Sequence, residues 1–248
     1  MSKHVAFVTG GNGGIGSAIC RELAKQGNTV VAGYFPPEKE SATAWQADMK
    51  EQGFDIEIAA IDVTNFADCE RVIGEVSQAH GVVDILVNCA GITRDGTLKK
   101  MPEENWKAVI STNLDSAFNV TRHVLNGMLD KGWGRIVNIA SVNGQRGQFG
   151  QANYSAAKAG MHGFTMAVAL ETAAKGITVN TISPGYISTP MTEAMPQDVL
   201  DSIVNSVPMR RMGKPEEIAN AVAWLASEGN AYTTGANIPV NGGLFTSH

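Results

Sequence analysis

Near its amino terminus the chain runs HVAFVT from His4 to Thr9 and continues GGNGGIG from Gly10 to Gly16. The first run predicts a buried strand, and the glycine cluster predicts a sharp turn that leads into a helix. In a parallel sheet this order places backbone N–H groups and a helix N-terminus beside a diphosphate, which only glycine lets the backbone approach. A purely structural turn is the alternative, because the spacing departs from the G-x-G-x-x-G fingerprint. The residues expected to bind a dinucleotide here are Gly10, Asn12, Gly13, Gly14, Ile15 and Gly16.

The rest of the chain repeats this alternation of strand and helix. Short runs rich in β-branched residues predict strands near residues 4–9, 29–33, 55–61, 83–88, 134–140, 177–182 and 236–240. Apolar positions at helical spacing predict helices near residues 14–26, 38–52, 66–80, 103–130, 152–175 and 215–227. With no linker or repeat in the 248 residues, we predict one α/β domain spanning residues 1–248. Its expected architecture is a Rossmann-type doubly wound parallel sheet with helices on both faces.

Composition excludes several classes of function. The formal net charge of −5, with no basic tract, argues against nucleic-acid binding. Apolar residues make up 44% and charged residues 17%, which argues against disorder, and no apolar run is long enough to span a membrane. The three cysteines show no disulfide or zinc spacing and the histidines no ligand spacing, so no metal is expected. Together with the lack of a signal-peptide pattern, this predicts a cytoplasmic protein.

The longest stretch without clear periodicity runs from about Gly185 to Gly213 and contains three prolines. A short helix is predicted within it at residues 197–205. Loops of this length in compact domains are usually functional, so we predict an active-site lid at about residues 186–212. A surface excursion without such a role is the alternative.

Tyr154 and Lys158 lie four residues apart in a predicted helix and therefore project from one face. Ser141 follows the predicted strand at residues 134–140, at the carboxyl edge of the sheet where ligands of this architecture bind. A tyrosine hydroxyl needs a nearby cation to exchange protons near neutral pH, and the Lys158 ammonium is expected to favour the phenolate. The three residues together predict acid–base chemistry at this edge.

These motifs share their order and spacing with one known family. The resemblance rests on Thr9-Gly10-x3-Gly14-Ile15-Gly16, Asn88-Cys89-Ala90-Gly91, Asn113, Ser141, Tyr154-x3-Lys158 and Pro184-Gly185. Over the whole chain this pattern resembles the short-chain dehydrogenase/reductase family. The one departure is Cys89, where the family usually repeats asparagine, and we expect little consequence because that stretch acts chiefly through its backbone.

The resemblance implies that the protein reduces a carbonyl group with a nicotinamide cofactor. Tyr154 would protonate the carbonyl oxygen while the nicotinamide delivers hydride to carbon, and Ser141 would hydrogen-bond the same oxygen. Lys158 would also hold the nicotinamide ribose. Asn113 resembles the family residue whose backbone distortion keeps a water between Lys158 and solvent, although an ordinary polar helix residue is the alternative. The implied catalytic residues are Asn113, Ser141, Tyr154 and Lys158, and the cofactor contacts beyond the glycine turn are Val63, Asn88, Ala90, Gly91, Tyr154, Lys158, Pro184, Gly185 and Ile187.

The choice of nicotinamide cofactor rests on the second predicted strand. An acidic residue at its end would bind the ribose 2′-hydroxyl and reject a 2′-phosphate, but the run from Val30 to Phe35 ends without one. Because Lys39 lies just beyond and is able to meet a phosphate, NADPH is expected rather than NADH. Lys39 as a solvated charge is the alternative. Asp62 is expected to contact the adenine amino group, with a turn-capping role as its alternative.

The loops around Tyr154 are most similar, within the family, to those of acetoacetyl-CoA reductases. This similarity implies reduction of acetoacetyl-CoA to (R)-3-hydroxybutyryl-CoA for polyhydroxybutyrate synthesis. Glutamine amides would reach the thioester oxygen, although loop solvation is the alternative, and local cations would attract the coenzyme A phosphates. The expected substrate contacts are Asp95, Lys100, Gln148, Phe149, Gln151 and Tyr186.

Three other functions remain open from the sequence. A 3-oxoacyl-acyl-carrier-protein reductase of fatty-acid synthesis would share all the chemistry, and a basic pair at Arg210 and Arg211 keeps it in view. A sugar or polyol dehydrogenase of the same family is disfavoured by the missing acidic residue. A non-enzymatic NADPH-binding sensor would have no need for the Ser141, Tyr154 and Lys158 set. The resemblance also implies a homotetramer.

Overall fold

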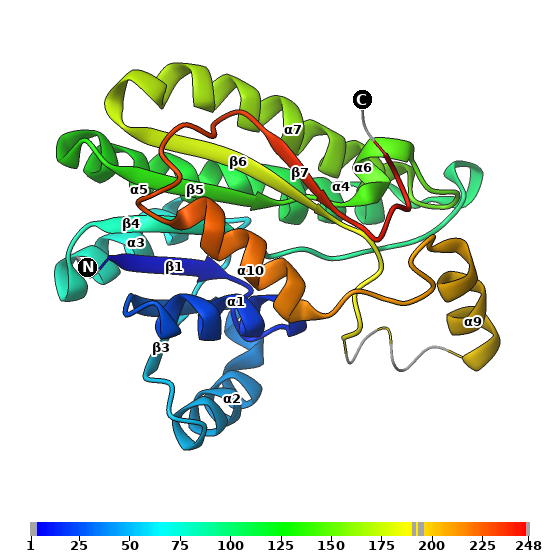
Figure 1. The fold of residues 1–248 in the computed structure, drawn as a ribbon, viewed down its shortest axis with the longest axis horizontal. Coiled ribbons are helices and arrows are strands. Elements are labelled where there is room, and N and C mark those ends of the chain that lie inside the picture. The colour runs from blue at the N-terminus through cyan, green and yellow to red at the C-terminus, as the bar shows by residue number, and fades with distance from the viewer. Residues whose placement is uncertain (1–3, 190–191, 193–195, 247–248) are drawn as a thin grey trace.

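The computed structural model describes residues 4–189, 192 and 196–246. Among these residues the sheet has seven strands in the order β3-β2-β1-β4-β5-β6-β7, and every neighbouring pair is parallel. The strands are β1 (Val5–Thr9), β2 (Thr29–Tyr34), β3 (Ile56–Ala60), β4 (Val83–Asn88), β5 (Gly134–Ile139), β6 (Ile177–Pro184) and β7 (Asn237–Val240). The strand order reverses between β1 and β4, so the predicted Rossmann-type doubly wound fold is confirmed (Figure 1).

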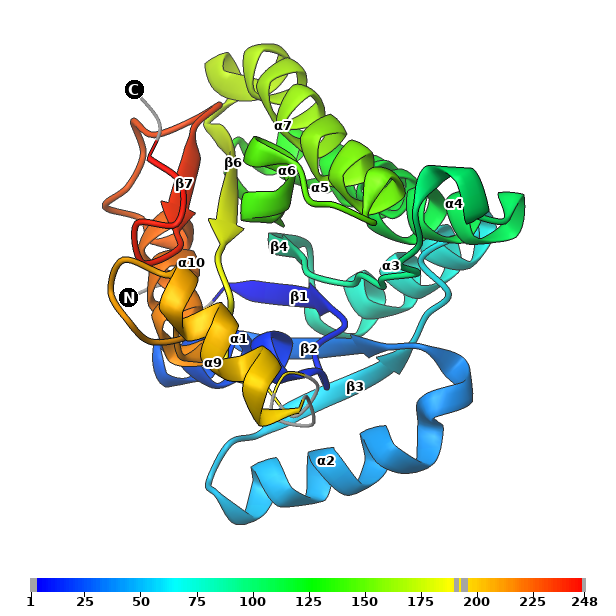
Figure 2. The same ribbon diagram turned by 90° about the vertical axis from the view of Figure 1, so that its right-hand side faces the viewer.

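Helices cover both faces of this sheet (Figure 2). They are α1 (Gly14–Lys25), α2 (Lys39–Glu51), α3 (Phe66–His80), α4 (Glu103–Ile110), α5 (Ser116–Lys131), α6 (Val142–Arg146), α7 (Ala152–Thr172), α9 (Gln197–Ser206) and α10 (Pro215–Ala226). One apolar cluster includes residues of α1, α2 and α10, and a second, on the other face, includes residues of α3, α5 and α7. The central strands β1, β4 and β5 are buried on both sides, which explains their largely apolar sequences.

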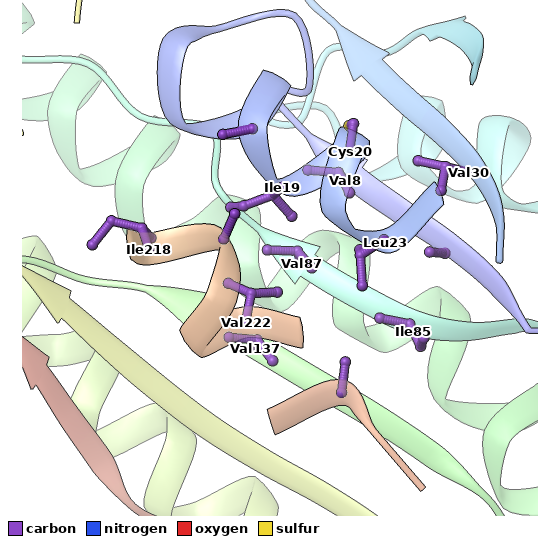
Figure 3. Packing of buried hydrophobic residues seen from close by; sticks show 14 of the residues in the cluster. Val8, Ile19, Cys20, Leu23, Val30, Ile85, Val87, Val137, Ile218 and Val222 are labelled. Carbon is purple, nitrogen blue, oxygen red and sulfur yellow. The ribbon is translucent and has the colours of Figure 1, made fainter. Parts of the chain in front are cut away.

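The core beneath the first glycine turn is formed by α1 and α10 against the middle strands (Figure 3). Ile19 and Leu23 of α1 are four residues apart, as are Ile218 and Val222 of α10, so each pair projects from one helix face. Burial of each such aliphatic side chain contributes about 1.5–3 kcal/mol to folding. This packing fixes the start of α1 against the carboxyl end of β1.

Two parts of the sequence fold differently from expectation. The helix predicted over residues 103–130 is divided into α4, a π-helical turn at Ser111–Asp115 and α5. The short helix α6 was not predicted, because it has only five residues and contains Gly144. No helix in the described part of the chain is both long enough and apolar enough to cross a membrane.

Candidate active site

The glycine turn joins β1 to α1 at the carboxyl edge of the sheet, and its geometry leaves room for a phosphate group. A Cβ on Gly16 would collide with the carbonyl oxygen of Gly10, so the turn can close this tightly only with glycine there. Gly13 and Gly14 at the start of α1 are exposed, and the first turn of the helix carries no acidic residue. The turn therefore presents an open, anion-compatible helix N-terminus that fits a dinucleotide diphosphate.

A threonine hydroxyl connects the glycine turn to the loop that follows β4. The hydroxyl oxygen of Thr9 accepts hydrogen bonds from the backbone N–H groups of Cys89, at 2.9 Å, and Ala90, at 3.0 Å. Beyond them, a Cβ on Gly91 would lie 2.5 Å from the side-chain oxygen of Asn113. Thr9 was expected only as part of the glycine motif. The Thr9 side chain also positions the loop after β4 beside β1.

Asn113 lies in the π-helical turn between α4 and α5, so the helix is distorted at the predicted residue. Its side chain is fully buried and its amide nitrogen donates to the carbonyl oxygens of Ile92 and Val109, each at 2.9 Å. The amide oxygen has no hydrogen-bond partner among the described residues. Such a buried, unpaired acceptor is the kind of group that an ordered water satisfies.

Ser141, Tyr154 and Lys158 converge from two elements at the same edge. Ser141 follows β5 and caps α6, and its hydroxyl lies near that of Tyr154 at the start of α7, close enough to lower the pKa of the tyrosine. One turn further along α7, the Lys158 ammonium donates to the carbonyl oxygen of Ile139 at 2.7 Å. It lies 5.7 Å from the centre of the Tyr154 ring. Two hydroxyl groups and a buried cation thus share one small region.

Burial shifts the pKa values of both titratable groups in this region. Desolvation lowers the pKa of Lys158 from its ordinary 10.5 to about 8. Desolvation also raises the pKa of Tyr154, whereas the nearby Ser141 hydroxyl acts in the opposite direction. In the protein alone, burial therefore outweighs the interactions that stabilise the Tyr154 phenolate, and the expected effect of Lys158 on the phenolate stays a prediction.

A family model described as enoyl-(acyl carrier protein) reductase matches residues 10–245. The chain belongs to the short-chain dehydrogenase/reductase family. Curated relatives include acetoacetyl-CoA reductases from Allochromatium vinosum, 61% identical over 98% of both chains, and from Cupriavidus necator, 55% identical over 98% of this chain and 99% of the relative. A 3-oxoacyl-[acyl-carrier-protein] reductase from Vibrio cholerae is 46% identical over 99% of this chain and 98% of the relative.

Reductases of this family use a nicotinamide cofactor. The side chains of two residues expected to bind it form hydrogen bonds within the protein. The amide nitrogen of Asn88 donates to Asn138, at 2.8 Å, and to Thr121, at 3.2 Å, inside the core. The Asp62 carboxylate accepts from the backbone N–H and the hydroxyl of Thr64, so it caps a turn. The turn-capping alternative for Asp62 is therefore seen in the structure, while its adenine contact stays a prediction. Val63 beside it is buried.

A carboxylate lies next to the glycine turn although the second strand itself does not end in an acidic residue. The side-chain nitrogen of Asn12 donates to the exposed carboxylate of Glu38 at 3.1 Å. Glu38 ends a short 3-10 helix at Pro36–Glu38, four residues beyond β2, and Lys39 begins α2 directly after it. A negative and a positive side chain thus follow one another in this segment, where only the positive Lys39 was expected to act on the cofactor.

The residues expected to bind substrate are distributed over the loops at this edge. Gln151 contacts Asp95, through hydrogen bonds of 2.9 and 3.0 Å from its amide nitrogen to the carboxylate oxygens. Phe149 is 89% exposed, and Gln148 and Lys100 are also exposed. The structure therefore brings Gln151 and Asp95 together and leaves Lys100, Gln148 and Phe149 open to solvent. The sixth expected residue, Tyr186, is half-buried.

The two ends of the predicted lid are joined at its base. The N–H of Ser188 donates to the carbonyl oxygen of Gly213 at 2.8 Å, and the N–H of Gly213 donates to that of Tyr186 at 2.9 Å. Ile187 is buried, and the N–H of Gly185 donates to the carbonyl oxygen of Val240. Between these ends, α9 confirms the predicted short helix and projects from the body of the molecule (Figures 1 and 2). Residues 190–191 and 193–195 of the predicted lid lie outside the described residues.

Proposed function

We propose that the protein is a nicotinamide-dependent reductase of 3-oxoacyl thioesters, acting on acetoacetyl-CoA to give (R)-3-hydroxybutyryl-CoA for polyhydroxybutyrate synthesis. The observation that carries the proposal is the convergence of the Ser141 and Tyr154 hydroxyl groups above the buried Lys158 ammonium. The names of the three relatives support the substrate class, because each denotes a reductase of 3-oxoacyl thioesters. We therefore propose ketone reduction rather than the enoyl reduction in the description of the family model.

In the proposed mechanism the two hydroxyl groups act on one carbonyl oxygen. A bound nicotinamide supplies the hydride that reduces the carbonyl carbon. Tyr154 donates its proton to the oxygen, and Ser141 donates a hydrogen bond that stabilises the developing negative charge. The raised pKa of Tyr154 suits this direction of reaction, since it keeps the hydroxyl protonated at neutral pH. The four catalytic residues that we propose are Asn113, Ser141, Tyr154 and Lys158.

Lys158 has two proposed roles in this mechanism. Its ammonium would bind the nicotinamide ribose, and it would return a proton to Tyr154 after each turnover. The unpaired, buried oxygen of Asn113 supports a water at the π-helical turn that links Lys158 to solvent. Both roles require the protonated lysine.

The pH dependence of the reaction is expected to follow Lys158. Because burial lowers its pKa to about 8, the ammonium form is lost as the pH rises through that value. The kcat/KM for the cofactor, which reports on the free enzyme, is expected to fall about tenfold per pH unit above pH 8. Initial rates measured from pH 6 to 10 check this, and a constant kcat/KM up to pH 9.5 would contradict the need for the ammonium.

NADPH is the proposed cofactor, and Lys39 is the proposed partner of its 2′-phosphate. Glu38 counters this preference, because its carboxylate lies beside Asn12 at the glycine turn, where it would repel a phosphate. The proposed balance between the two cofactors therefore depends on adjacent charges of opposite sign.

Two single substitutions separate these charges. Glu38→Gln is expected to tighten NADPH binding by about three- to tenfold with little change for NADH, since only repulsion of the phosphate is removed. Lys39→Ala is expected to weaken NADPH binding more than NADH binding. Dissociation constants from titration of cofactor fluorescence measure both effects, and equal changes for NADPH and NADH would remove these residues from the phosphate site.

Substrate turnover decides between the proposed function and its nearest alternative. The 46% identity to a 3-oxoacyl-[acyl-carrier-protein] reductase favours the carrier-protein thioester as the second candidate. The experiment is the initial rate of NADPH or NADH oxidation with acetoacetyl-CoA, compared with acetoacetyl carrier protein at equal concentration. Faster turnover of the coenzyme A ester, with an (R) product, supports the first function. A clear preference for the carrier-protein ester supports the second.

We further propose a homotetramer in the cytoplasm, with residues 186–212 as a lid over bound substrate. Met161 is buried in the core, but Met166 on the same helix is 53% exposed. Phe118 on α5 and Leu170 on α7 are exposed as well, which supports burial of these helices against a second subunit. The mass of the protein in solution tests the assembly.

A further inference from the structure

A chain of hydrogen bonds connects the catalytic serine to the loop after β4 through a residue that the sequence did not single out. The side-chain nitrogen of Asn143 donates to the side-chain oxygen of Gln151 at 2.9 Å. The side-chain nitrogen of Gln151 in turn donates to the Asp95 carboxylate. At its other end, the backbone N–H of Asn143 donates to the hydroxyl oxygen of Ser141 at 3.1 Å.

The directions of the side-chain hydrogen bonds in this series are set by Asp95. A carboxylate only accepts, so Gln151 must turn its nitrogen toward Asp95 and its oxygen toward Asn143. Asn143 must then donate from its side-chain nitrogen, which fixes the orientation of its amide. Both ends of the Gln151 amide, which is also expected to reach the thioester oxygen, have protein partners.

The same segments are also joined through the backbone. The N–H of Gly96 donates to the carbonyl oxygen of Gly150 at 2.8 Å, and Gly96 pairs with Gln151 as an isolated parallel bridge. Asn153, fully buried, donates to the carbonyl oxygen of Arg94 and accepts from the N–H of Tyr154. The loop after β4 is therefore fixed to the start of α7, and Asn143 connects this assembly to Ser141.

We infer that Asn143 is a positioning residue for the proposed carbonyl reduction. By holding its own backbone N–H against the Ser141 oxygen, it occupies an acceptor position of that hydroxyl and leaves the hydroxyl proton for the substrate oxygen. The Asp95 carboxylate and the Gln151 amide hold Asn143 in place, so these two residues also act on Ser141 through Asn143. The inference rests on the proposed function for its effect on rate but not for the contacts themselves.

Exchanging the amide at position 143 and the carboxylate at position 95 tests this inference. In Asn143→Asp the new carboxylate faces the side-chain oxygen of Gln151, and the two oxygens repel one another. Rotating the Gln151 amide by a half-turn relieves this repulsion but places its oxygen against the Asp95 carboxylate instead. We expect kcat to fall about 10- to 100-fold with KM changed less than threefold, because Ser141 is needed mainly in the transition state. The decrease in kcat is expected to be smaller for Asp95→Asn, since the new amide oxygen still accepts a hydrogen bond from Gln151.

The double variant Asn143→Asp with Asp95→Asn is expected to recover the kcat lost in Asn143→Asp. A rotated Gln151 amide can then donate to the new carboxylate and accept from the new amide. We expect its kcat to return to within about threefold of that of Asp95→Asn alone. Asn65→Asp is the matched control for the added charge, because this exposed residue caps α3 and a carboxylate also accepts there. Wild-type kcat in Asn143→Asp, or a double variant as slow as that single variant, would overturn the inference.

Melting temperatures of the same proteins keep this test separate from the proposed function. Asn143→Asp is expected to melt a few degrees lower than the wild type, with recovery in the double variant. If the wild type does not reduce acetoacetyl-CoA but the melting temperatures follow this pattern, the proposed substrate is wrong and the hydrogen-bond chain stands. If the wild type is active and neither kcat nor melting temperature recovers in the double variant, the chain is wrong.

Discussion

Tyr154→Phe is expected to lower kcat for acetoacetyl-CoA about 10³-fold while the dissociation constant of the cofactor changes less than threefold. The phenyl ring keeps the packing at the start of α7, and only the hydroxyl near Ser141 is removed. Loss of a positioned proton donor typically removes a factor of about 10² to 10⁴ in rate. Steady-state kinetics and titration of cofactor fluorescence measure the two quantities on one preparation.

Tyr232→Phe is the control for this substitution, because that tyrosine is fully exposed and outside the proposed site. Its kcat is expected to match that of the wild type. Substantial activity in Tyr154→Phe would show that another group donates the proton. A loss of cofactor binding equal to the loss of rate would show instead that the hydroxyl holds the cofactor.

The fold could be predicted from the sequence because its signals are local and repeated. The central strands are buried on both faces and are therefore short apolar runs, and helices such as α1 bury one apolar face. The π-helical turn at residues 111–115 interrupts no such pattern, so apolar spacing alone predicts one continuous helix there. Only the resemblance placed a distortion at Asn113.

The order of the motifs also located the catalytic residues at one edge of the sheet, because all parallel strands end there. It did not give the contacts between side chains from distant segments. The hydrogen bond between Asn12 and Glu38 joins residues 26 apart, and the one between Gln151 and Asp95 joins residues 56 apart. The direction of the pKa shift of Tyr154 depends on how deeply the side chain is buried. The spacing of residues along the chain does not encode this burial.

Lys158 combines a proposed catalytic role with an unfavourable contribution to stability. Its side chain is only 3% exposed, and burial lowers its pKa from 10.5 to about 8. A shift of this size corresponds to roughly 3 kcal/mol of folding free energy lost at neutral pH. The hydrogen bond to the carbonyl oxygen of Ile139 compensates only part of the desolvation. The residue is therefore expected to lower stability while it supports catalysis.

Lys158→Met is accordingly expected to inactivate the enzyme and to stabilise the fold. Methionine has a similar length and no charge, so the desolvation penalty of about 3 kcal/mol disappears. The carbonyl oxygen of Ile139 loses its partner, which costs about 1–2 kcal/mol. We expect a net gain of about 1–2 kcal/mol, a melting temperature about 3 °C higher at pH 7, and a kcat at least 100-fold lower. Thermal unfolding and initial rates measure these changes.

The gain in stability is expected to depend on pH in one direction. Below about pH 8 the lysine is charged in both the folded and the unfolded wild type, so its penalty is fully present. Between pH 8 and 10.5 the unfolded chain binds more protons than the folded one, and the wild type becomes more stable relative to the variant as the pH rises. The difference in melting temperature is therefore expected to shrink over that window. A variant that melts below the wild type at pH 7 would mean that the surrounding dipoles stabilise the ammonium more than burial destabilises it.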